Sequence, residues 1–296
     1  MLLSEIGVIA VVGAGQMGAG IAQVCAQRGY RVLLADAALE RAKSAKLGVD
    51  QQLSRLRDKN KLSAADCEAA SARIEATTAE LAYPQADLVI EAATENRELK
   101  LALFEQADAL SPPHAILASN TSSVSITLLA GQTKRADRVV GMHFMNPVPI
   151  MKLVELVHGL ETSSETLATV RGLAEALQKT VIVSQDRPGF LVNRMLIPFL
   201  NEACFALDEG TGSAEDIDQG ARLGLNHPLG PLELADLIGL DTVLAIASVL
   251  EQDFGDPKYR PSILLKNMVS AGYLGRKTKR GFYVYDEQGK KLRASP

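Results

Sequence analysis

The sequence has few cysteines and contains no long apolar run. Its three cysteines, Cys25, Cys67 and Cys204, are widely separated and lack the spacing of metal ligands, so we expect reduced thiols and no metal site. No apolar run is long enough to cross a bilayer, which argues against a membrane partner. A strand pattern begins so close to the first residue that no cleavable leader is expected. These absences favour a cytoplasmic protein.

The sequence also lacks an excess of basic residues. Lysine and arginine number 31 against 35 aspartates and glutamates, which gives a net charge of −4. Proteins that bind nucleic acids usually carry a concentrated basic face, so no nucleic-acid partner is expected. The 296 residues exceed the roughly 250 at which a single core usually stops growing, so we expect two domains.

Strand and helix patterns alternate over the first two thirds of the chain. The apolar runs that predict strands lie at 6–12, 31–35, 87–92, 115–119, 139–143, 152–158 and 180–184. Helical periods separate several of them, at 18–28, 97–110 and 164–178, and a polar helical insert is predicted over about 39–73. This alternation is typical of α/β proteins and predicts a Rossmann-type, doubly wound sheet over residues 1–185.

Helical patterns dominate the remainder of the chain. They occur at 190–209, 214–223, 232–237, 242–254 and 262–271, and one strand-like run follows at 282–285. We therefore predict a helical C-terminal domain, all-helical in class, over residues 186–296.

A glycine-rich turn follows the first predicted strand. The residues Gly13-Ala14-Gly15-Gln16-Met17-Gly18 match G-x-G-x-x-G, a motif that becomes specific only when a strand precedes it and a helix follows. Gly13 permits the tight turn, Gly15 lets the backbone approach a pyrophosphate, and Gly18 allows close helix–strand packing.

Asp36 lies 18 residues beyond Gly18, at the end of the next predicted strand. A carboxylate there accepts hydrogen bonds from the adenosine ribose hydroxyls and repels a 2′-phosphate, and no arginine follows it closely in the sequence. These features predict NAD, not NADP. The alternative is a nucleotide-free turn in which Asp36 caps the following helix.

An NAD-dependent enzyme that oxidises an alcohol needs a base to take the hydroxyl proton, and histidine suits this role because its pKa lies near neutrality. The chain has four histidines, and we compare their positions as candidates for this base. His114 precedes a predicted strand, at the edge of the sheet away from bound ligands, while His158 and His227 are most simply structural. His143 ends a predicted strand at the carboxyl edge, where a nicotinamide would lie. It is therefore the candidate base.

Glu155 is the candidate partner of His143. If the strand that follows 144–149 returns antiparallel, Glu155 reaches the same edge as His143. A carboxylate there would orient the imidazole and stabilise its charged form. The alternatives are a capped strand-end histidine and an edge charge that discourages aggregation.

Several ordered blocks extend the pattern over nearly the whole chain. They are Gly13-Ala-Gly-Gln-Met-Gly-Ala-Gly-Ile-Ala22, Ser119-Asn-Thr-Ser-Ser123, His143-Phe-Met-Asn-Pro-Val-Pro149, Met151-Lys-Leu-Val-Glu155, Pro188-Gly-Phe-Leu-Val-Asn-Arg194, His227-Pro-Leu-Gly-Pro231 and Leu274-Gly-Arg-Lys-Thr-Lys-Arg-Gly-Phe-Tyr283. Together they resemble the short-chain 3-hydroxyacyl-CoA dehydrogenase family, which includes bacterial 3-hydroxybutyryl-CoA dehydrogenases.

The resemblance implies roles for particular residues. It makes His143 the acid–base group with Glu155 as partner, places Ser122 at the substrate oxygen beside the nicotinamide, and gives Asn193 a part in holding the thioester substrate. From the residues alone, Ser122 is a helix N-cap candidate and Asn193 a buried polar residue that needs partners. The resemblance also implies contacts with NAD from Glu95, Lys100, Asn146 and Lys277. From the residues alone, both lysines would be solvated surface charges.

Two further features bear on ligands. The helical insert is rich in basic residues that could receive the phosphates of coenzyme A, and Lys59 is the best single candidate, although most of these residues are expected to form a soluble helix face.

Family members commonly have Lys-Thr-Gly where this chain has Lys277-Thr278-Lys279. If that position needs a positive φ, Lys279 would strain the turn and weaken the case for a contact between Lys277 and NAD.

The resemblance thus implies hydride transfer between NAD and C3 of a short (S)-3-hydroxyacyl-CoA, in fatty-acid metabolism such as β-oxidation. The helices of the second domain are apolar enough to pair subunits, so a homodimer is expected. Two alternatives remain. One is a related NAD-dependent dehydrogenase of a hydroxy acid without coenzyme A, and the other is a non-catalytic NAD-binding structural protein.

Overall fold

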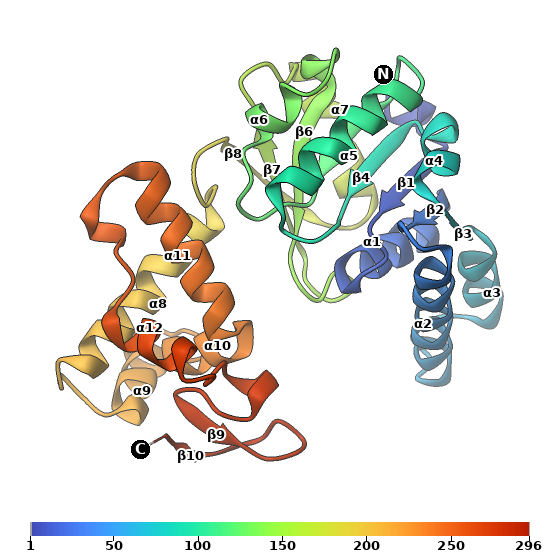
Figure 1. Cartoon of the computed structure of the whole chain (residues 1–296). Helices are drawn as coiled ribbons and strands as arrows, with labels where there is room; N and C mark the ends of the chain where they lie inside the picture. Colours follow the sequence, from blue (N-terminus) through green and yellow to red (C-terminus); the bar gives the residue numbers. More distant parts are fainter. Residues whose placement is uncertain (1, 296) are drawn as a thin grey trace. The chain divides into compact units, whose positions relative to one another are not determined.

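The computed structural model describes residues 2–295, and the chain divides into two compact units. One unit runs through Arg187 and the other begins at Pro188. Each has its own core of buried apolar side chains. Figure 1 shows the ribbon of both units.

The first unit is built on an eight-stranded sheet with the order β3-β2-β1-β4-β5-β6-β7-β8. Its strands are β1 (Val8–Val12), β2 (Arg31–Ala35), β3 (Ile74–Thr77), β4 (Leu88–Glu91), β5 (Ile116–Ser119), β6 (Val139–Phe144), β7 (Leu153–His158) and β8 (Thr180–Gln185). Neighbouring strands are parallel except β6 and β7, which are antiparallel. The strand order reverses at β1, so a ligand crevice is expected at the carboxyl ends of β1 and β4. The predicted doubly wound class is confirmed.

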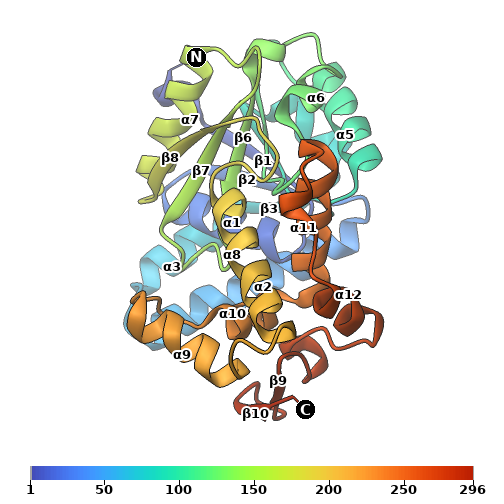
Figure 2. The ribbon, with the colours of Figure 1, turned by 90° about the vertical axis from the view of Figure 1, so that its left-hand side faces the viewer.

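Helices cover both faces of this sheet. On one face lie α1 (Gln16–Gln27), α7 (Ser164–Ala176) and the helical pair α2 (Leu39–Asp58) and α3 (Ala64–Ala72), whose apolar residues share one core with the sheet. The helices α4 (Ala79–Ala82), α5 (Arg97–Leu110) and α6 (Ile126–Ala130) belong to the other face, and Figure 2 shows α5 and α6 across the sheet from α7. Short 3-10 turns occupy Leu3–Glu5, Tyr83–Gln85 and Ala136–Arg138.

Helices α3, α5, α6 and α7 begin at side-chain caps that the sequence supplies. Ser63 accepts a hydrogen bond from the backbone N–H of Asp66 at the start of α3, and Asn96 accepts one from Leu99 at the start of α5. Such caps satisfy N–H groups that the helix itself leaves unpaired. The cap at Asn96 explains why α5 begins at residue 97, as the sequence predicted.

The edge strand β3 was not predicted. Its four residues, Ile-Glu-Ala-Thr, contain one large apolar side chain, which is too weak an alternation to be recognised. The strand forms because β2 offers a free edge to it in parallel register, with Val32 opposite Ile74. Tertiary pairing, not local preference, determines this element.

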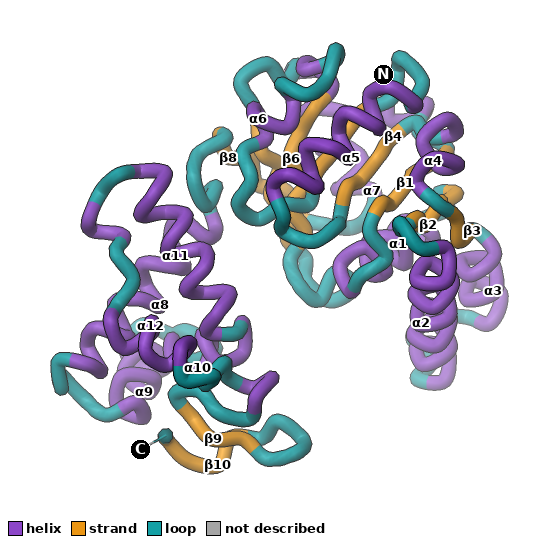
Figure 3. The backbone as a smooth tube through the Cα atoms, in the orientation of Figure 1, coloured by secondary structure: helices purple, strands orange, loops and turns teal. Residues whose placement is uncertain are grey.

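The second unit packs helices around an apolar core. They are α8 (Val192–Asp208), α9 (Ala214–Gly224), α10 (Pro231–Ile238), α11 (Leu240–Phe254) and α12 (Ile263–Ser270), with 3-10 turns at Pro257–Tyr259 and Arg276–Thr278. Figure 3 also shows the antiparallel strands β9 (Tyr283–Tyr285) and β10 (Lys291–Ala294). The unit is therefore mainly helical but not all-helical, which corrects that detail of the expectation.

A buried carboxylate anchors this hairpin. Asp236 on α10 accepts hydrogen bonds from the backbone N–H groups of Phe282 and Tyr283 and from the hydroxyl of Tyr285, each at 2.9 Å. Burial raises the pKa of Asp236 to about 6, against the opposing effect of these hydrogen bonds. The hairpin thus depends on a long-range contact that local sequence patterns do not reveal.

Two glycines provide a test of the packing between β6 and β7. A Cβ added at Gly141 on β6 would lie 2.5 Å from Cβ of Val157 on β7, whereas one added at Gly48 inside α2 would meet no described atom within 4 Å. We expect Gly141→Ala to destabilise the protein by about 1–3 kcal/mol through overpacking. Gly48→Ala should stabilise it by about 0.5–1 kcal/mol, because alanine favours a helix.

Thermal unfolding followed by circular dichroism measures both changes. A shift of about 2–4 °C per kcal/mol is expected for a unit of this size. Equal midpoints for the two variants would show that β6 and β7 are not packed as described.

Candidate active site

The centre of the site is an imidazole beside a carboxylate. Strands β6 and β7 pair with His143 directly opposite Glu155, and Nδ1 of His143 lies 3.1 Å from Oε2 of Glu155. Glu155 is 0% exposed and His143 is 8% exposed. A buried carboxylate without a partner would be costly, so this contact is also a condition for the strand pair to form. A proton shared between Nδ1 and the carboxylate leaves Nε2 as the ring nitrogen that can accept a substrate proton.

The remaining histidines have structural surroundings. His114 is exposed, and its Nε2 lies 3.0 Å from Oδ1 of Asp87, a carboxylate that also accepts hydrogen bonds from the N–H groups of Gly7 and Val8. His227 stacks on Phe199 with ring centroids 4.9 Å apart. The pair of His114 and Asp87 is largely exposed and precedes β5, at the amino edge of the sheet, away from the glycine turn.

The glycine-rich turn fits a dinucleotide for steric reasons. Gly13 has a φ of +108°, and a Cβ there would lie 2.6 Å from the backbone of Ala92. A Cβ at Gly18 would overlap the carbonyl oxygen of Gly13, whereas one at Gly15 would meet no described atom within 4 Å. Open space at Gly15 and a helix start that no described side chain caps leave room and N–H donors for phosphates. The residues present therefore fit a pyrophosphate.

Asp36 directly follows β2, beside this turn. Its Oδ2 accepts a hydrogen bond from the N–H of Ala14 at 2.9 Å, and Ala38, not Asp36, is the N-cap of α2. The side chain of Arg41 reaches back, with Nε 3.4 Å from Oδ1 of Asp36. No arginine follows Asp36 closely in the sequence, but the first turn of α2 brings Arg41, five positions later, alongside the carboxylate.

Ser122 lies in a loop that converges on one carboxylate. Oε1 of Glu95 accepts hydrogen bonds from the N–H and hydroxyl of Ser122, from the N–H and hydroxyl of Ser123, and from the hydroxyl of Thr121, over 2.6–3.1 Å. Burial opposes ionisation of Glu95, but the charge of Lys100 and these hydrogen bonds outweigh it and lower its pKa. Ser122 is therefore not the cap of the next helix. That cap is Ser125.

Lys100 is buried, which corrects the expectation of a solvated charge. It is 1% exposed, and its Nζ lies 2.8 and 3.0 Å from the carboxylate oxygens of Glu91 and 3.3 Å from Oε2 of Glu95. Glu91 also accepts a hydrogen bond from the hydroxyl of Ser119 at 2.6 Å and one from the N–H of Ala93 at 2.7 Å. Lys100 thereby ties the end of β4 to the loop that carries Ser122.

The sequence interpretation missed Glu91 as a member of the site. The signal was present, because Glu91 is a charge at the end of a buried apolar strand, the same feature that identified Glu155. Its partner could not be identified in the same way. Lys100 faces Glu91 only because α5 packs against β4.

The loop after His143 is fixed at three points. Asn146 accepts a hydrogen bond from the side chain of Gln16 at 3.2 Å. The side chain of Asn120 accepts one from the N–H of Phe144 at 2.9 Å. Buried Lys179 donates to the carbonyl oxygens of Val148 and Met151 at 2.6 and 2.8 Å, and its burial lowers its pKa. Asn120 and Lys179 are supporting residues that sequence patterns did not indicate.

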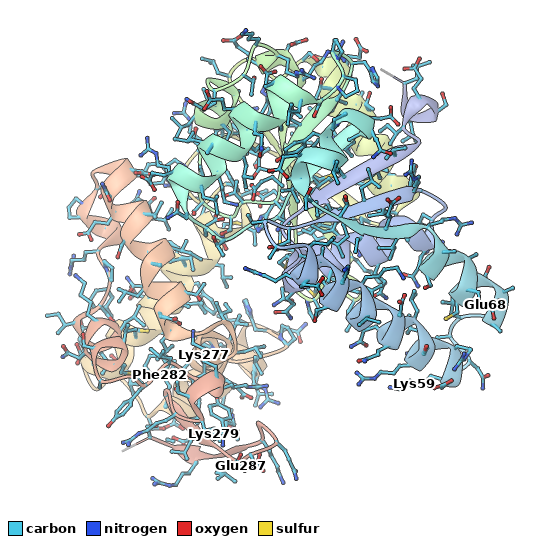
Figure 4. The ribbon with its side chains drawn as sticks, turned by 45° about the vertical axis from the view of Figure 1, so that its right-hand side comes forward. Lys59, Glu68, Lys277, Lys279, Phe282 and Glu287 are labelled. Carbon is cyan, nitrogen blue, oxygen red and sulfur yellow. The ribbon has the colours of Figure 1, made fainter. Side chains whose placement is uncertain are left out.

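The remaining candidates lie on other elements. Asn193 is buried on α8 of the second unit. Lys277 of that unit lies 2.6 Å from both carboxylate oxygens of Asp241, which lowers the pKa of Asp241 against the effect of burial. In the first unit Lys59 is exposed at the end of α2 (Figure 4). Lys279 has a φ of +59°, so the strained turn expected from the sequence is confirmed.

A glycine turn at the switch point of a mostly parallel sheet, together with an oriented imidazole near the carboxyl end of β6, is typical of nicotinamide-dependent oxidoreductases. Known proteins resolve the class further. The family model for the NAD-binding domain of 3-hydroxyacyl-CoA dehydrogenase matches residues 8–187, and the model for its C-terminal domain matches residues 189–285. The chain belongs to the 3-hydroxyacyl-CoA dehydrogenase family, as the sequence blocks predicted.

Individual relatives match along nearly their whole length. A probable 3-hydroxybutyryl-CoA dehydrogenase of Bacillus subtilis is 49% identical, covering 96% of this chain and 99% of the relative. A 3-hydroxybutyryl-CoA dehydrogenase of Bradyrhizobium diazoefficiens is 48% identical, with 94% of each chain covered. Among solved structures, the (S)-3-hydroxybutyryl-CoA dehydrogenase of Ralstonia eutropha has a TM-score of 0.93 and 52% identity, and the match covers 96% of this chain and 100% of that one.

Residues 2–295 hold no helix long and apolar enough to cross a membrane, and no group of three or more His, Cys, Asp and Glu side chains that could hold a metal ion. The cysteines Cys25, Cys67 and Cys204 are buried free thiols.

The buried pair of Lys100 and Glu91 can be tested by removing one charge. We expect Lys100→Met to destabilise the protein by about 3–5 kcal/mol, because it leaves Glu91 buried without a counter-charge. Lys43→Met is the matched control. Lys43 pairs with Glu40 on the exposed face of α2, where an ion pair contributes about 0.5 kcal/mol.

Urea unfolding of both variants gives the comparison, and adding Glu91→Gln to Lys100→Met should restore part of the loss. Similar small effects for Lys100→Met and Lys43→Met would contradict the buried pair.

Proposed function

We propose that this protein transfers a hydride between NAD and C3 of a short (S)-3-hydroxyacyl-CoA, with 3-hydroxybutyryl-CoA and acetoacetyl-CoA as the substrate pair. The observation that carries the proposal is the contact of His143 with buried Glu155 at the carboxyl edge of the sheet. Relatives whose names specify 3-hydroxybutyryl-CoA dehydrogenase share about half of their residues with this chain, which supports the choice of substrate.

Each residue of the pair has one task in the reaction. In the oxidation, Nε2 of His143 accepts the proton of the C3 hydroxyl as the hydride leaves C3, and in the reduction it returns that proton to the carbonyl oxygen. Bound NAD supplies the hydride acceptor. Glu155 holds the imidazole by Nδ1 and stabilises its cation once the proton has moved. Ser122 contacts the substrate oxygen, and Asn193 helps to hold the thioester.

The cofactor proposal uses the residues around the glycine turn. The glycine turn Gly13-Ala14-Gly15-Gln16-Met17-Gly18 receives the pyrophosphate, through the N–H groups at the start of α1, and Asp36 accepts hydrogen bonds from the ribose hydroxyls. The other proposed contacts come from Glu95, Lys100, Ser122, Asn146 and Lys277. We propose that residues 1–185 form this NAD-binding domain, and that residues 186–296 bind the acyl substrate and form the dimer contact. Lys59 is proposed to contact coenzyme A.

The function is tested by following NADH absorbance with acetoacetyl-CoA, free acetoacetate and longer 3-ketoacyl-CoAs. We expect turnover with the thioesters, and a loss of about 10²–10⁴ in kcat for His143→Ala, because the proton then has no positioned donor. Turnover only with free keto acids would favour a dehydrogenase of a non-CoA hydroxy acid. NADH binding without turnover would favour a non-catalytic NAD-binding protein.

Glu155→Gln serves as the control for this assay. It keeps a hydrogen-bonding side chain of the same size but removes the negative charge, so kcat should fall while the Kd for NADH stays within about twofold. A Glu155→Gln enzyme with normal kcat would remove Glu155 from the mechanism.

We further propose a homodimer in the cytoplasm. Large apolar side chains are exposed on the second unit, among them Met195, Leu223, Leu225 and Ile263, and such side chains in quantity commonly mark an interface. Sedimentation equilibrium at micromolar concentration should give twice the mass of one chain. A single-chain mass at that concentration would contradict the dimer.

A further inference from the structure

An exposed guanidinium lies beside the carboxylate proposed to bind the ribose. Arg41 occupies the first turn of α2, and its Nε lies 3.4 Å from Oδ1 of Asp36 at the end of β2. The Arg41 side chain is 68% exposed, whereas that of Asp36 is 8% exposed. Oδ2 of Asp36 accepts the N–H of Ala14 at 2.9 Å, whereas Oδ1, which faces Arg41, accepts only the N–H of Ala38 at 3.5 Å. Oδ1 is therefore the oxygen more open to a ribose hydroxyl.

This arrangement combines two features that usually distinguish two kinds of enzyme. A carboxylate at the end of the second strand accepts hydrogen bonds from the 2′-hydroxyl of NAD and repels the 2′-phosphate of NADP, and a nearby arginine accommodates that phosphate. Here the carboxylate and the arginine contact each other. The charge of Arg41 therefore partly offsets the repulsion that Asp36 exerts on a 2′-phosphate.

We propose that Arg41 determines how strictly this enzyme prefers NAD. When the ribose carries a 2′-hydroxyl, Arg41 remains paired with Asp36. When a 2′-phosphate is present, the exposed guanidinium turns to it and forms charge-assisted hydrogen bonds. The proposal rests on the proposed dinucleotide site and adds a residue that governs its selectivity.

Other charges around Asp36 support Arg41 as the cation concerned. Further along α2, Lys43 pairs with Glu40 at 2.7 Å and Lys46 pairs with Asp50 at 3.1 Å, so both have carboxylate partners away from Asp36. The N-terminus of α2, a helix of 20 residues, adds a partial positive charge on the same side. An anion beside Asp36 would meet Arg41 and this helix end together.

The test is a double-mutant cycle on cofactor binding, measured by calorimetric titration of the full chain with NADH and with NADPH. Asp36→Asn keeps an acceptor for the N–H of Ala14 but removes the charge, so the Kd for NADPH should fall by about tenfold or more. Adding Arg41→Ala should reverse that gain by about tenfold. Arg41→Ala alone should weaken NADPH binding by a similar factor and change the Kd for NADH by less than about twofold.

Two controls make the result specific. Lys43→Ala removes a cation from the same helix and should leave both dissociation constants within about twofold. Raising the salt concentration should weaken NADPH binding to Asp36→Asn more than to Asp36→Asn/Arg41→Ala, because an exposed ion pair is screened.

Equal NADPH affinities for Asp36→Asn and Asp36→Asn/Arg41→Ala would overturn the role of Arg41. If NADH bound the wild type normally, that result would leave the dinucleotide site intact. Failure of the wild type to bind NADH would overturn the site and the role of Arg41 together. No acyl substrate is used, so the outcome is independent of the proposed reaction.

Discussion

Buried carboxylates at the carboxyl edge of the sheet impose the constraint on which the site depends. Glu91 and Glu155 lie in strands that are otherwise mostly apolar, and each is almost fully removed from water. An ionised group in such a place must be paired, or folding loses several kcal/mol. His143 meets this requirement for Glu155 and Lys100 meets it for Glu91. The contacts that permit folding are therefore the contacts that orient the reactive groups.

One reversal of strand direction makes this arrangement possible. If β7 were parallel to β6, a long crossover would have to join the two strands. Residues only 12 positions apart could then not lie directly opposite each other. Because β7 returns antiparallel, the register places His143 against Glu155. Lys179 and Asn120 hold the connecting loop from two sides, so the reversal is fixed by side-chain contacts as well as by the ladder. A rigid loop keeps the imidazole close to its required position.

The features that the sequence predicted depend on local patterns, whereas the features that it missed depend on contacts between separate segments of the chain. The glycine turn, the two domains' classes and the pairing of His143 with Glu155 follow from local patterns plus the geometry of strands. Strand β3, the burial of Lys100 and the approach of Arg41 to Asp36 arise from packing between segments or from a helix turn that redirects a side chain. Single-sequence patterns carry no information on such partners, so a charge on an amphipathic helix was assigned to solvent by default.

Lys279 shows how a departure from a family pattern can be tolerated. A non-glycine residue at a φ of +59° costs about 1–2 kcal/mol relative to right-handed backbone, a cost that glycine would avoid. The neighbouring turn is held by contacts that do not involve the side chain at this position, because Asp236 binds the backbone of Phe282 and Tyr283 and the N–H of Tyr285 binds the carbonyl of Lys279. Lys279 also pairs with Glu287 (Figure 4). A small local strain therefore does not alter the turn, since the hairpin is positioned by a buried carboxylate and not by the preference of one residue.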